Sequence, residues 1–443
     1  MRLAIALYAL LWHLLLPVFF AYLWWRGKRE PLYRQFWNER LGLAGPAQPA
    51  VDRQRPLWVH CASLGELRGA QSIVQALLDQ GQHIVLTTWT PAGRQAASTL
   101  FADAMAQQRL FCRYVPAEWS WAIARFIRHW KPACAMVTES EAWPLLLTTI
   151  RSHGVPLCKA NAQYPSTSYQ RDAAWGGFRS RLYSAYELVM CKSSRHAARF
   201  QTIGCKRVEV VGETRFEQTI PEHHLTQARR LRALPEFSGR PVVCFASTVT
   251  AEDETFLVAA RRLKAALGNP LIVYVPRSPQ RFAEVAQLIR SAGLSVVQRS
   301  TWLDAQLQPQ ASLNGESVDV LLGDSLGEMY FYLEWAQAVV VGASFVDQGS
   351  HNIIEPLALH KPVWVGPSVW GIEFPGVEAL EAGALHQAAD GEHLAQQLIV
   401  VLSDAAVLEV AQRQAAAFFS EHSGATAKHL AVFLPWLKEQ KAP

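Results

Sequence analysis

The sequence has no paired cysteines and no cluster of histidines and cysteines. Its seven cysteines stand singly, none of them in a Cys-x-x-Cys pair, and several lie inside apolar runs that are typical of strands. This distribution favours reduced, buried thiols over disulfides, and no group has the spacing of a zinc site. The chain also lacks a long basic stripe, because 42 basic residues face 37 acidic ones for a net charge of +5. We therefore expect no nucleic-acid partner.

One long stretch near the N-terminus has no charged residue. Between Leu3 and Trp25 the sequence contains no Asp, Glu, Lys or Arg. A helix of this length spans about 30 Å, which is enough to cross a bilayer. Two tryptophans end the run where the interfacial belt would lie, and more basic residues follow it than precede it. The basic residues that follow are Arg26, Lys28, Arg29 and Arg34.

This charge pattern predicts an uncleaved, single-pass membrane anchor over residues 1–28, with the rest of the chain on the cytoplasmic side. A cleaved signal peptide would have a shorter apolar region and a small-residue cleavage site, whereas Trp24, Trp25 and Arg26 follow here. A helix that lies flat against the same membrane face is the remaining alternative.

The rest of the chain is typical of two parallel α/β domains. A length of 443 residues suits two domains, and a composition of 50% apolar and 18% charged residues suits a folded core. Short apolar runs alternate with helical stretches, as in parallel sheets covered by helices. Residues 234–240, rich in turn formers, are predicted to be the linker. We expect two Rossmann-like domains, 29–234 and 241–443, that face one another across a cleft.

The same alternation predicts the strands. In the first domain they are 56–63, 83–90, 109–116, 133–140, 156–162, 187–193 and 207–213. In the second domain they are 241–248, 271–276, 294–299, 318–324, 338–344 and 362–366. Doubly wound sheets bind ligands beyond the carboxyl ends of their strands, so polar residues at those ends are candidates for a site.

A glutamate follows the first predicted strand at the start of a helix. The residues there are Ser63-Leu64-Gly65-Glu66. A carboxylate at this position can project beyond the sheet and take a proton from a sugar hydroxyl as a general base. The alternative is structural, because Ser-x-x-Glu is common at helix starts: Ser63 caps the helix and Glu66 completes a capping box.

Two more carboxylates, Glu139 and Glu141, follow the strand predicted at 133–140. Acids at the carboxyl end of a strand can bind a polyhydroxyl ligand and perturb each other's ionisation. They are equally typical of acidic caps in the first turn of the next helix.

In the second domain, several strand ends offer groups that suit a phosphate. Ser247 and Thr248 close one predicted strand, Arg277 follows the next, and Gly327 and Glu328 stand at a later helix start. Hydroxyls, arginines and the backbone N–H groups of a helix start all bind phosphate. Taken singly, these residues are also typical of helix caps and solvated surface positions.

The most informative motif follows the predicted strand 338–344 and reads Gly349-Ser350-His351-Asn352-Ile353-Ile354-Glu355-Pro356. A buried strand, a glycine turn and a helix start form a nucleotide-binding geometry, because free N–H groups and the helix dipole attract phosphate. Glu355 stands where it can accept hydrogen bonds from two ribose hydroxyls. Glycine turns also occur for steric reasons alone, so the other segments give this motif its weight.

Taken in order, these segments resemble the bacterial 3-deoxy-D-manno-octulosonic acid (Kdo) transferase family, the lipid A Kdo transferases. The likeness extends over nearly the whole chain, from the apolar start to the motif at Glu355. The matching segments are Tyr33, 39–42, 63–66, 139–144, Asn161-Ala162, 246–248, Pro276-Arg277, 323–328, His351-Asn352 and Glu355-Pro356.

The resemblance implies a GT-B fold, CMP-Kdo as the donor, a lipid A precursor as the acceptor, and no metal or other cofactor. It places the chain in lipopolysaccharide synthesis at the inner (cytoplasmic) membrane. It implies that Glu66 is the general base of an inverting transfer and that Glu139 is important for activity. The expected acceptor-side contacts are Ser63, Gly65, Glu141 and Asn161. The expected nucleotide-side contacts are Ser247, Thr248, Arg277, Gly327, Glu328, Asn352 and Glu355.

Several segments depart from the family pattern. The family's Asn-Ala-Arg-Leu-Ser-x-Arg-Ser has lost both arginines in residues 161–168, and Val249 and Ser278 replace histidines. Glu213 and Arg215 stand in the family's Gly-Asn-x-Lys segment. Lost positive charge weakens the expected binding of anionic ligands. Two alternatives therefore remain: a membrane-anchored protein that binds lipid A or a partner without catalysis, and a transferase that uses another sugar nucleotide.

Overall fold

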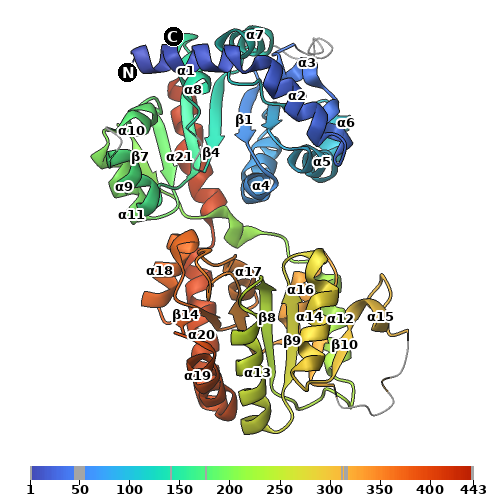
Figure 1. The fold of residues 1–443 in the computed structure, drawn as a ribbon. Coiled ribbons are helices and arrows are strands. Elements are labelled where there is room, and N and C mark those ends of the chain that lie inside the picture. Colours follow the sequence, from blue (N-terminus) through green and yellow to red (C-terminus); the bar gives the residue numbers. More distant parts are fainter. Residues whose placement is uncertain are drawn as a thin grey trace. The chain divides into compact units, whose positions relative to one another are not determined.

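The computed structural model describes residues 2–43, 55–139, 142–174, 177–310, 313 and 318–440. Within them the chain forms two compact units, each built on a seven-stranded parallel sheet with helices packed on it (Figure 1). The first unit holds Met1–Gln218 and Ser423–Pro443, and the second unit holds Thr219–His422. The predicted class, two parallel α/β domains of the GT-B type, is confirmed.

The first unit has the strand order β3-β2-β1-β4-β5-β6-β7. Its strands are β1 (Leu57–Cys61), β2 (Ile84–Thr88), β3 (Leu110–Tyr114), β4 (Cys134–Thr138), β5 (Leu157–Ala162), β6 (Leu188–Cys191) and β7 (Val208–Val210). Its helices are α1 (Arg2–Leu14), α2 (Leu16–Arg26), η1 (Pro31–Arg34), α3 (Trp37–Arg40), α4 (Leu64–Asp79), α5 (Pro91–Leu100), α6 (Ala102–Ala106), α7 (Ser120–Trp130), α8 (Pro144–Ser152), α9 (Ser166–Ala174), α10 (Phe178–Tyr183), α11 (Ser194–Thr202), η2 (Thr214–Glu217) and α21 (Ala425–Glu439).

The second unit has the strand order β10-β11-β9-β8-β12-β13-β14. Its strands are β8 (Val242–Thr248), β9 (Leu271–Pro276), β10 (Val296–Gln298), β11 (Val320–Leu322), β12 (Ala338–Val341), β13 (Val363–Val365) and β14 (Leu385–Gln387). Its helices are α12 (Glu222–Arg232), α13 (Asp253–Leu267), η3 (Pro279–Arg281), α14 (Phe282–Ser291), α15 (Arg299–Trp302), α16 (Met329–Trp335), α17 (Ile354–Ala358), η4 (Trp370–Ile372), α18 (Glu373–Glu381), α19 (Gly391–Ser403) and α20 (Ala405–His422).

Burial explains why the strands could be predicted. Both faces of a parallel sheet are covered by helices, so its central strands are continuous apolar runs. In β1, β2 and β4 every residue is buried, and each predicted strand contains an observed one. The edge strand β14 was not predicted, because its three residues, Leu-His-Gln, form no apolar run.

The compact units divide the chain at Gln218 and Thr219 rather than at the expected linker. Residues 234–240 belong to the second unit, where Phe237 is fully buried between Trp302 and Trp335. Arg240 donates to the backbone carbonyls of Pro270 and Val318 at 2.8 and 2.6 Å. These turn-forming residues therefore form a packed corner of the second unit. The first unit consists of two separate stretches of chain, one before and one after the second unit.

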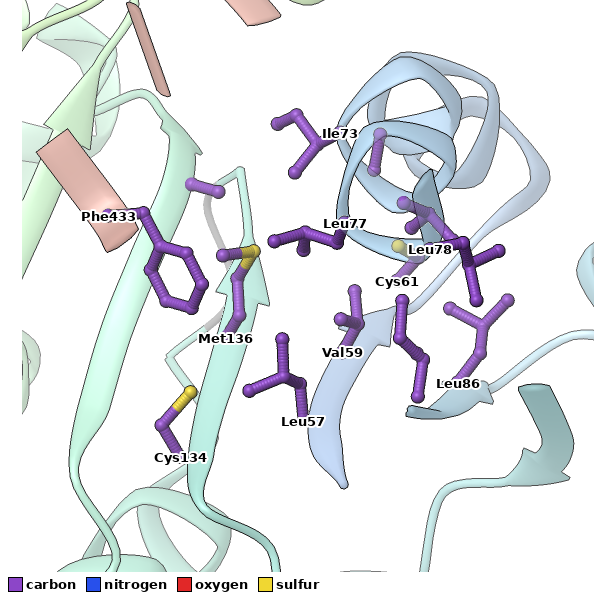
Figure 2. Close-up of a cluster of buried hydrophobic side chains, with 14 of the residues drawn as sticks. Leu57, Val59, Cys61, Ile73, Leu77, Leu78, Leu86, Cys134, Met136 and Phe433 are labelled. Carbon is purple, nitrogen blue, oxygen red and sulfur yellow. The ribbon is translucent and has the colours of Figure 1, made fainter. Parts of the chain in front are cut away.

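The last helix of the chain, α21, completes the core of the first unit (Figure 1). Phe433, Trp436 and Leu437 are almost fully buried in the cluster formed by one face of the sheet and α4. Figure 2 shows the ring of Phe433 beside Met136 of β4. A domain boundary at residue 241 would have assigned this helix to the other unit.

The N-terminal apolar run forms two helices instead of the expected single one. Pro17, in the first turn of α2, lacks a backbone N–H and disfavours a continuous helix, and α1 and α2 meet at an angle of 54°. Among the described residues, no single helix has the length and hydropathy of a membrane span. Two bent pairs pass on length and composition together: α1 with α2, and residues 391–403 with 405–439.

The α1–α2 pair packs on the first unit along one side only. The indole Nε1 of Trp119 donates to the Trp12 carbonyl at 2.9 Å, and Phe19 and Leu23 are buried in the same aromatic cluster. The other side of the pair exposes large apolar side chains. They are Leu3, Leu7, Leu10, Leu11, Leu14, Leu15, Val18, Tyr22, Trp24 and Trp25.

Two buried histidines of the first unit are held neutral. Burial lowers the pKa of His60, on β1, to about 4, and its Nδ1 lies 3.0 Å from Thr87 Oγ1. Burial also lowers the pKa of His429, on α21, to about 4. Its Nδ1 lies 2.8 Å from the Ala425 carbonyl oxygen. A buried imidazole binds its proton less readily than an exposed one, because the charged form loses its hydration.

These histidines make the free energy of unfolding of the first unit depend on pH. Their folded pKa values, about 4, lie below the ordinary value of 6.5, so the unfolded chain takes up protons first as the pH falls. We expect the free energy of unfolding to fall between pH 6.5 and 4, by about 1.4 kcal/mol per pH unit for each group. Chemical denaturation across this range measures the slope. His429→Gln should reduce it, and an unchanged slope in that variant would contradict the assignment.

Candidate active site

Glu66 lies in the first turn of α4, directly beyond the carboxyl end of β1. Ser63 caps this helix, because its Oγ accepts a hydrogen bond from the Glu66 backbone N–H at 3.3 Å. The Glu66 carboxylate reaches further back, and its Oε2 accepts from the Ala62 N–H at 2.8 Å and from Thr138 Oγ1 at 2.9 Å. Ser63 therefore caps the helix, and Glu66 also reaches back to the backbone before it, as the structural alternative expects. Glu66 is at the same time a buried carboxylate at a helix N-terminus, where the dipole favours negative charge.

Glu139 follows β4, next to Thr138, in a left-handed backbone conformation with φ of 52°. Its carboxylate accepts from Arg215 and, at 3.1 Å, from the Gln163 side chain, and Lys192 Nζ lies 3.6 Å away. The side chain is 9% exposed. Ends of neighbouring parallel strands lie at one edge of the sheet, and Thr138 connects the two carboxylates by bonding to Glu66. Glu141 lies outside the described residues.

Two basic and two acidic side chains form a buried network around Glu139. Lys192 Nζ lies 2.6 Å from Glu213 Oε2, and both side chains are almost inaccessible. Burial alone would raise the pKa of Glu213, but Lys192 and Arg215 outweigh it and the pKa lies below its ordinary value. Burial acts to lower the pKa of Arg215, and the charges of Glu213, Glu139 and Glu66 raise it overall. Arg215 is thus close enough to Glu66 for their charges to interact.

The departures from the family pattern belong to this network. Gln163, at the position of a family arginine, donates to Glu139 and accepts from Lys192 at 3.3 Å. Glu213 and Arg215, which replace the asparagine and lysine of the family pattern, pair with Lys192 and Glu139. Arg215 keeps the positive charge of the family's lysine, whereas Gln163 and Glu213 each lower the charge by one, so the network is less positive here than in the family pattern. Lys192 was not singled out from the sequence, although its place directly after β6 is the kind of position that indicates a site.

Asn161 connects three of the elements that form the candidate site. Its side chain is fully buried; Nδ2 donates to Thr214 Oγ1 at 2.7 Å and to the Gly69 carbonyl at 3.1 Å, and Oδ1 accepts from the Thr214 N–H. Asn161 thereby joins β5 to α4, which carries Glu66, and to η2, which carries Arg215. Gly65 lies in the exposed part of the first turn of α4. The Arg215 guanidinium lies 3.5 Å from its carbonyl oxygen.

In the second unit, three strand ends converge on the predicted nucleotide residues. The Thr248 carbonyl, at the end of β8, accepts from the Arg277 N–H beyond β9 at 2.9 Å. Gly342, beyond β12, passes so close to β8 that an added Cβ would lie 2.6 Å from the Ser247 carbonyl oxygen. Ser247 itself adopts φ of 58°. These loops therefore form one connected edge.

Glu252 ties two of these loops together. Its fully buried carboxylate accepts four backbone N–H groups, those of Val249 at 3.2 Å, Ala343 at 2.7 Å, Ser344 at 2.9 Å and Phe345 at 2.9 Å. By its position before α13, Glu252 would be taken for a simple charge at a helix start. The structure shows instead that it shapes the loop that leads to the glycine motif, and no local sequence signal distinguishes these two roles.

The glycine motif has the expected strand, turn and helix. Asn352 Oδ1 accepts from the N–H of Ile354, the first residue of α17, at 3.0 Å, and Glu355 lies half-buried in the first turn of that helix. Burial lowers the pKa of His351, and the charge of Arg277 lowers it further. Arg277 is thus near enough to His351 for its charge to act on the imidazole.

Glu328 and Gly327 lie at a further strand end of this unit. Glu328 pairs with Arg299 at 2.5 Å and accepts from the hydroxyls of Ser325 and Tyr332, so its charge is used within the unit. Gly327 is exposed with φ of 82°. In the part of the chain that the structure describes, no three histidine, cysteine, aspartate or glutamate side chains gather as metal ligands.

Comparisons with known proteins agree with this arrangement. Residues 35–218 match the family described as 3-deoxy-D-manno-octulosonic-acid transferase (kdotransferase), and the match ends where the first segment of the first unit ends. The chain is 35% identical over 428 residues to the 3-deoxy-D-manno-octulosonic acid transferase of Bordetella pertussis, covering 96% of this chain and 97% of that one. The Haemophilus influenzae enzyme of the same name is 31% identical over 342 residues, 76% of each chain.

A solved glycosyltransferase from Rickettsia africae has the same fold at only 13% identity, with a TM-score of 0.54 over 88% of this chain and 99% of that one. This likeness concerns the fold alone, whereas the two relatives match over most of their length in sequence. The chain is a glycosyltransferase and belongs to the 3-deoxy-D-manno-octulosonic acid (Kdo) transferase family.

Proposed function

We propose that this chain transfers Kdo from CMP-Kdo to a lipid A precursor in lipopolysaccharide synthesis, with inversion and without a metal. The observation that carries the proposal is the setting of Glu66. Two hydrogen bonds, from Ala62 and Thr138, hold its carboxylate at the start of α4, in the unit that matches the Kdo transferase family. We assign acceptor binding to this unit and nucleotide-sugar binding to the second unit.

Glu66 is the general base in this mechanism. It takes the proton from an acceptor hydroxyl while the hydroxyl oxygen forms a bond to the anomeric carbon of Kdo. The bond from that carbon to the CMP phosphate oxygen breaks on the opposite face, and its electron pair leaves with CMP. Glu139, Lys192 and Arg215 set the charge around the base, and Ser63 and Gly65 shape the acceptor side of the same turn.

The second unit holds the nucleotide and takes up the charge of departing CMP. Ser247, Thr248 and Arg277 bind phosphate, and the start of α17, next to Asn352, adds backbone donors. Glu355 accepts from the ribose hydroxyls. Gly327 and Glu328 form the wall of the nucleotide site, with Glu328 acting through its pairing to Arg299. CMP is already a moderately good leaving group, so preorganised donors can replace a metal ion.

The α1–α2 pair attaches the enzyme to the inner membrane, with the catalytic units on the cytoplasmic side. Its packed side is fixed to the first unit through Trp12 and Phe19, and its outer side is apolar. An apolar face flanked by Arg26, Lys28 and Arg29 suits a helix pair lying in the interface more than a straight span, because a span would separate Trp12 from Trp119. The attachment raises the effective concentration of a lipid acceptor at the site.

The test of this function is to incubate membranes containing the protein with CMP-Kdo and a tetraacylated lipid A precursor. Mass spectrometry of the lipid should show a product heavier by one or more Kdo residues. No product with CMP-Kdo, but a product with another sugar nucleotide, would overturn the donor assignment and support the alternative donor.

Glu66→Gln should abolish transfer without unfolding the protein. The amide keeps the shape of the side chain but cannot accept a proton, and loss of a general base lowers kcat by about 10²- to 10⁴-fold. Radiolabelled Kdo transfer to lipid measures the loss. The control is Asp79→Asn, the same change at the exposed other end of α4. Near-normal turnover by Glu66→Gln would refute the assignment.

Glu355→Ala should chiefly weaken nucleotide binding. Loss of the carboxylate removes the proposed hydrogen bonds to the ribose, each worth about 1.5–3 kcal/mol when one partner is charged, so the Kd for CMP should rise at least about tenfold. Isothermal titration calorimetry with CMP measures it, with the exposed Glu409→Ala on α20 as the control. Equal affinities of the two variants would count against this role.

A further inference from the structure

The helix α21 contacts Asn161, the residue that links β5 to α4 and η2, through the side chain of His429. His429, on α21, is 1% exposed. Its Nδ1 lies 2.8 Å from the carbonyl oxygen of Ala425, and its Nε2 lies 3.2 Å from the backbone nitrogen of Asn161. The two residues are 268 positions apart in the sequence, so neither motif nor spacing indicates this contact.

The two contacts define the proton position on the ring. A carbonyl oxygen only accepts hydrogen bonds, so Nδ1 carries the hydrogen and Nε2 is the acceptor for the Asn161 N–H. Burial lowers the pKa of His429 to about 4, and the nearby charge of Lys192 lowers it further. The ring therefore stays neutral at physiological pH and keeps its acceptor.

Asn161 requires an acceptor at this place. Its φ of 46° is left-handed, and the pairing of β5 with β6 shifts register between Lys159 and Ala162, so the ladder is interrupted around it. A buried backbone N–H without an acceptor is destabilising, because it has given up its hydrogen bond to water. His429 supplies that acceptor from outside the sheet and so fixes the orientation of Asn161.

The orientation of Asn161 affects the two elements that carry Glu66 and Arg215, α4 and η2. Its side chain bonds to Gly69 of α4, the helix of Glu66, and to Thr214 of η2, which lies between Glu213 and Arg215. The start of α21 is hydrogen-bonded to the same two elements. Thr426 Oγ1 donates to Ser72 Oγ of α4 at 2.7 Å, and the backbone N–H of Thr426 donates to Glu217 of η2 at 3.1 Å.

We propose that His429 is a positioning residue for the transfer reaction. It holds Asn161 in the conformation that sets α4, and hence Glu66, against η2 and Arg215. This inference rests on the proposed function of Glu66. It gives the C-terminal helix a part in the reaction, although the helix follows the whole second unit in the sequence.

The test compares three variants. His429→Leu keeps the bulk and removes the acceptor, so we expect kcat to fall about tenfold with the KM for CMP-Kdo unchanged. In His429→Gln the side-chain oxygen can take the place of Nε2, and kcat should recover to within about threefold of the unmodified protein. Phe433→Leu disturbs the same helix away from Asn161, so it should lower thermal stability but leave the kcat of the folded enzyme within about twofold.

Hydrogen exchange provides a readout that needs no activity. The peptide containing Asn161 should exchange faster in His429→Leu than in Phe433→Leu, by about tenfold at the amide concerned. Equal exchange in these two variants, equal loss of kcat in both, or no recovery in His429→Gln would each overturn the inference. If the unmodified protein transfers no Kdo, the proposed function is overturned instead. The hydrogen-exchange result would then still show whether His429 holds the backbone N–H of Asn161.

Discussion

The first unit depends on pairing the charges that it buries at the carboxyl edge of its sheet. Glu139, Glu213, Lys192 and Arg215 are largely shielded from water, and removing one partner of such a pair leaves an uncompensated charge at a cost of about 3–5 kcal/mol. Each of them therefore constrains the others. Glu66, the base that we propose, lies beside this network, and its carboxylate accepts from Thr138, the residue before Glu139.

Three departures from the family pattern lie in this network. Arg215 keeps the positive charge of the family's lysine, whereas Gln163 and Glu213 each lower the charge by one, and Lys192 pairs with both buried glutamates. In the second unit a single buried carboxylate has a comparable structural effect without a cation. Glu252 accepts four backbone N–H groups and so holds the loops after β8 and β12 in place.

Local pattern predicted the parts of the molecule that local physics determines. Continuous apolar runs predicted every strand of both sheets except β14. The candidates Glu66 and Glu139 in the first unit and the motif at Glu355 in the second follow such runs, because parallel topology places strand ends at the carboxyl edge of each sheet. The sequence could not predict what distant segments contribute. Nothing around His429 indicates that it meets Asn161. Pro17 is a signal for the bend in the apolar start, but nothing near it shows that the two helices would pack on Trp119. Turn-forming residues 234–240 indicated a linker, whereas burial of Phe237 makes them part of the second unit.

The central claim is that the carboxylate of Glu66 accepts the proton of the acceptor hydroxyl. The most direct measurement is the pH dependence of kcat/KM for Kdo transfer by the unmodified protein and by Glu66→Gln. The account predicts that the rate of the unmodified protein rises with pH through an ionisation that disappears in the variant, which keeps only a slow residual rate without that rise. A variant that keeps both the ionisation and a near-normal rate would contradict it.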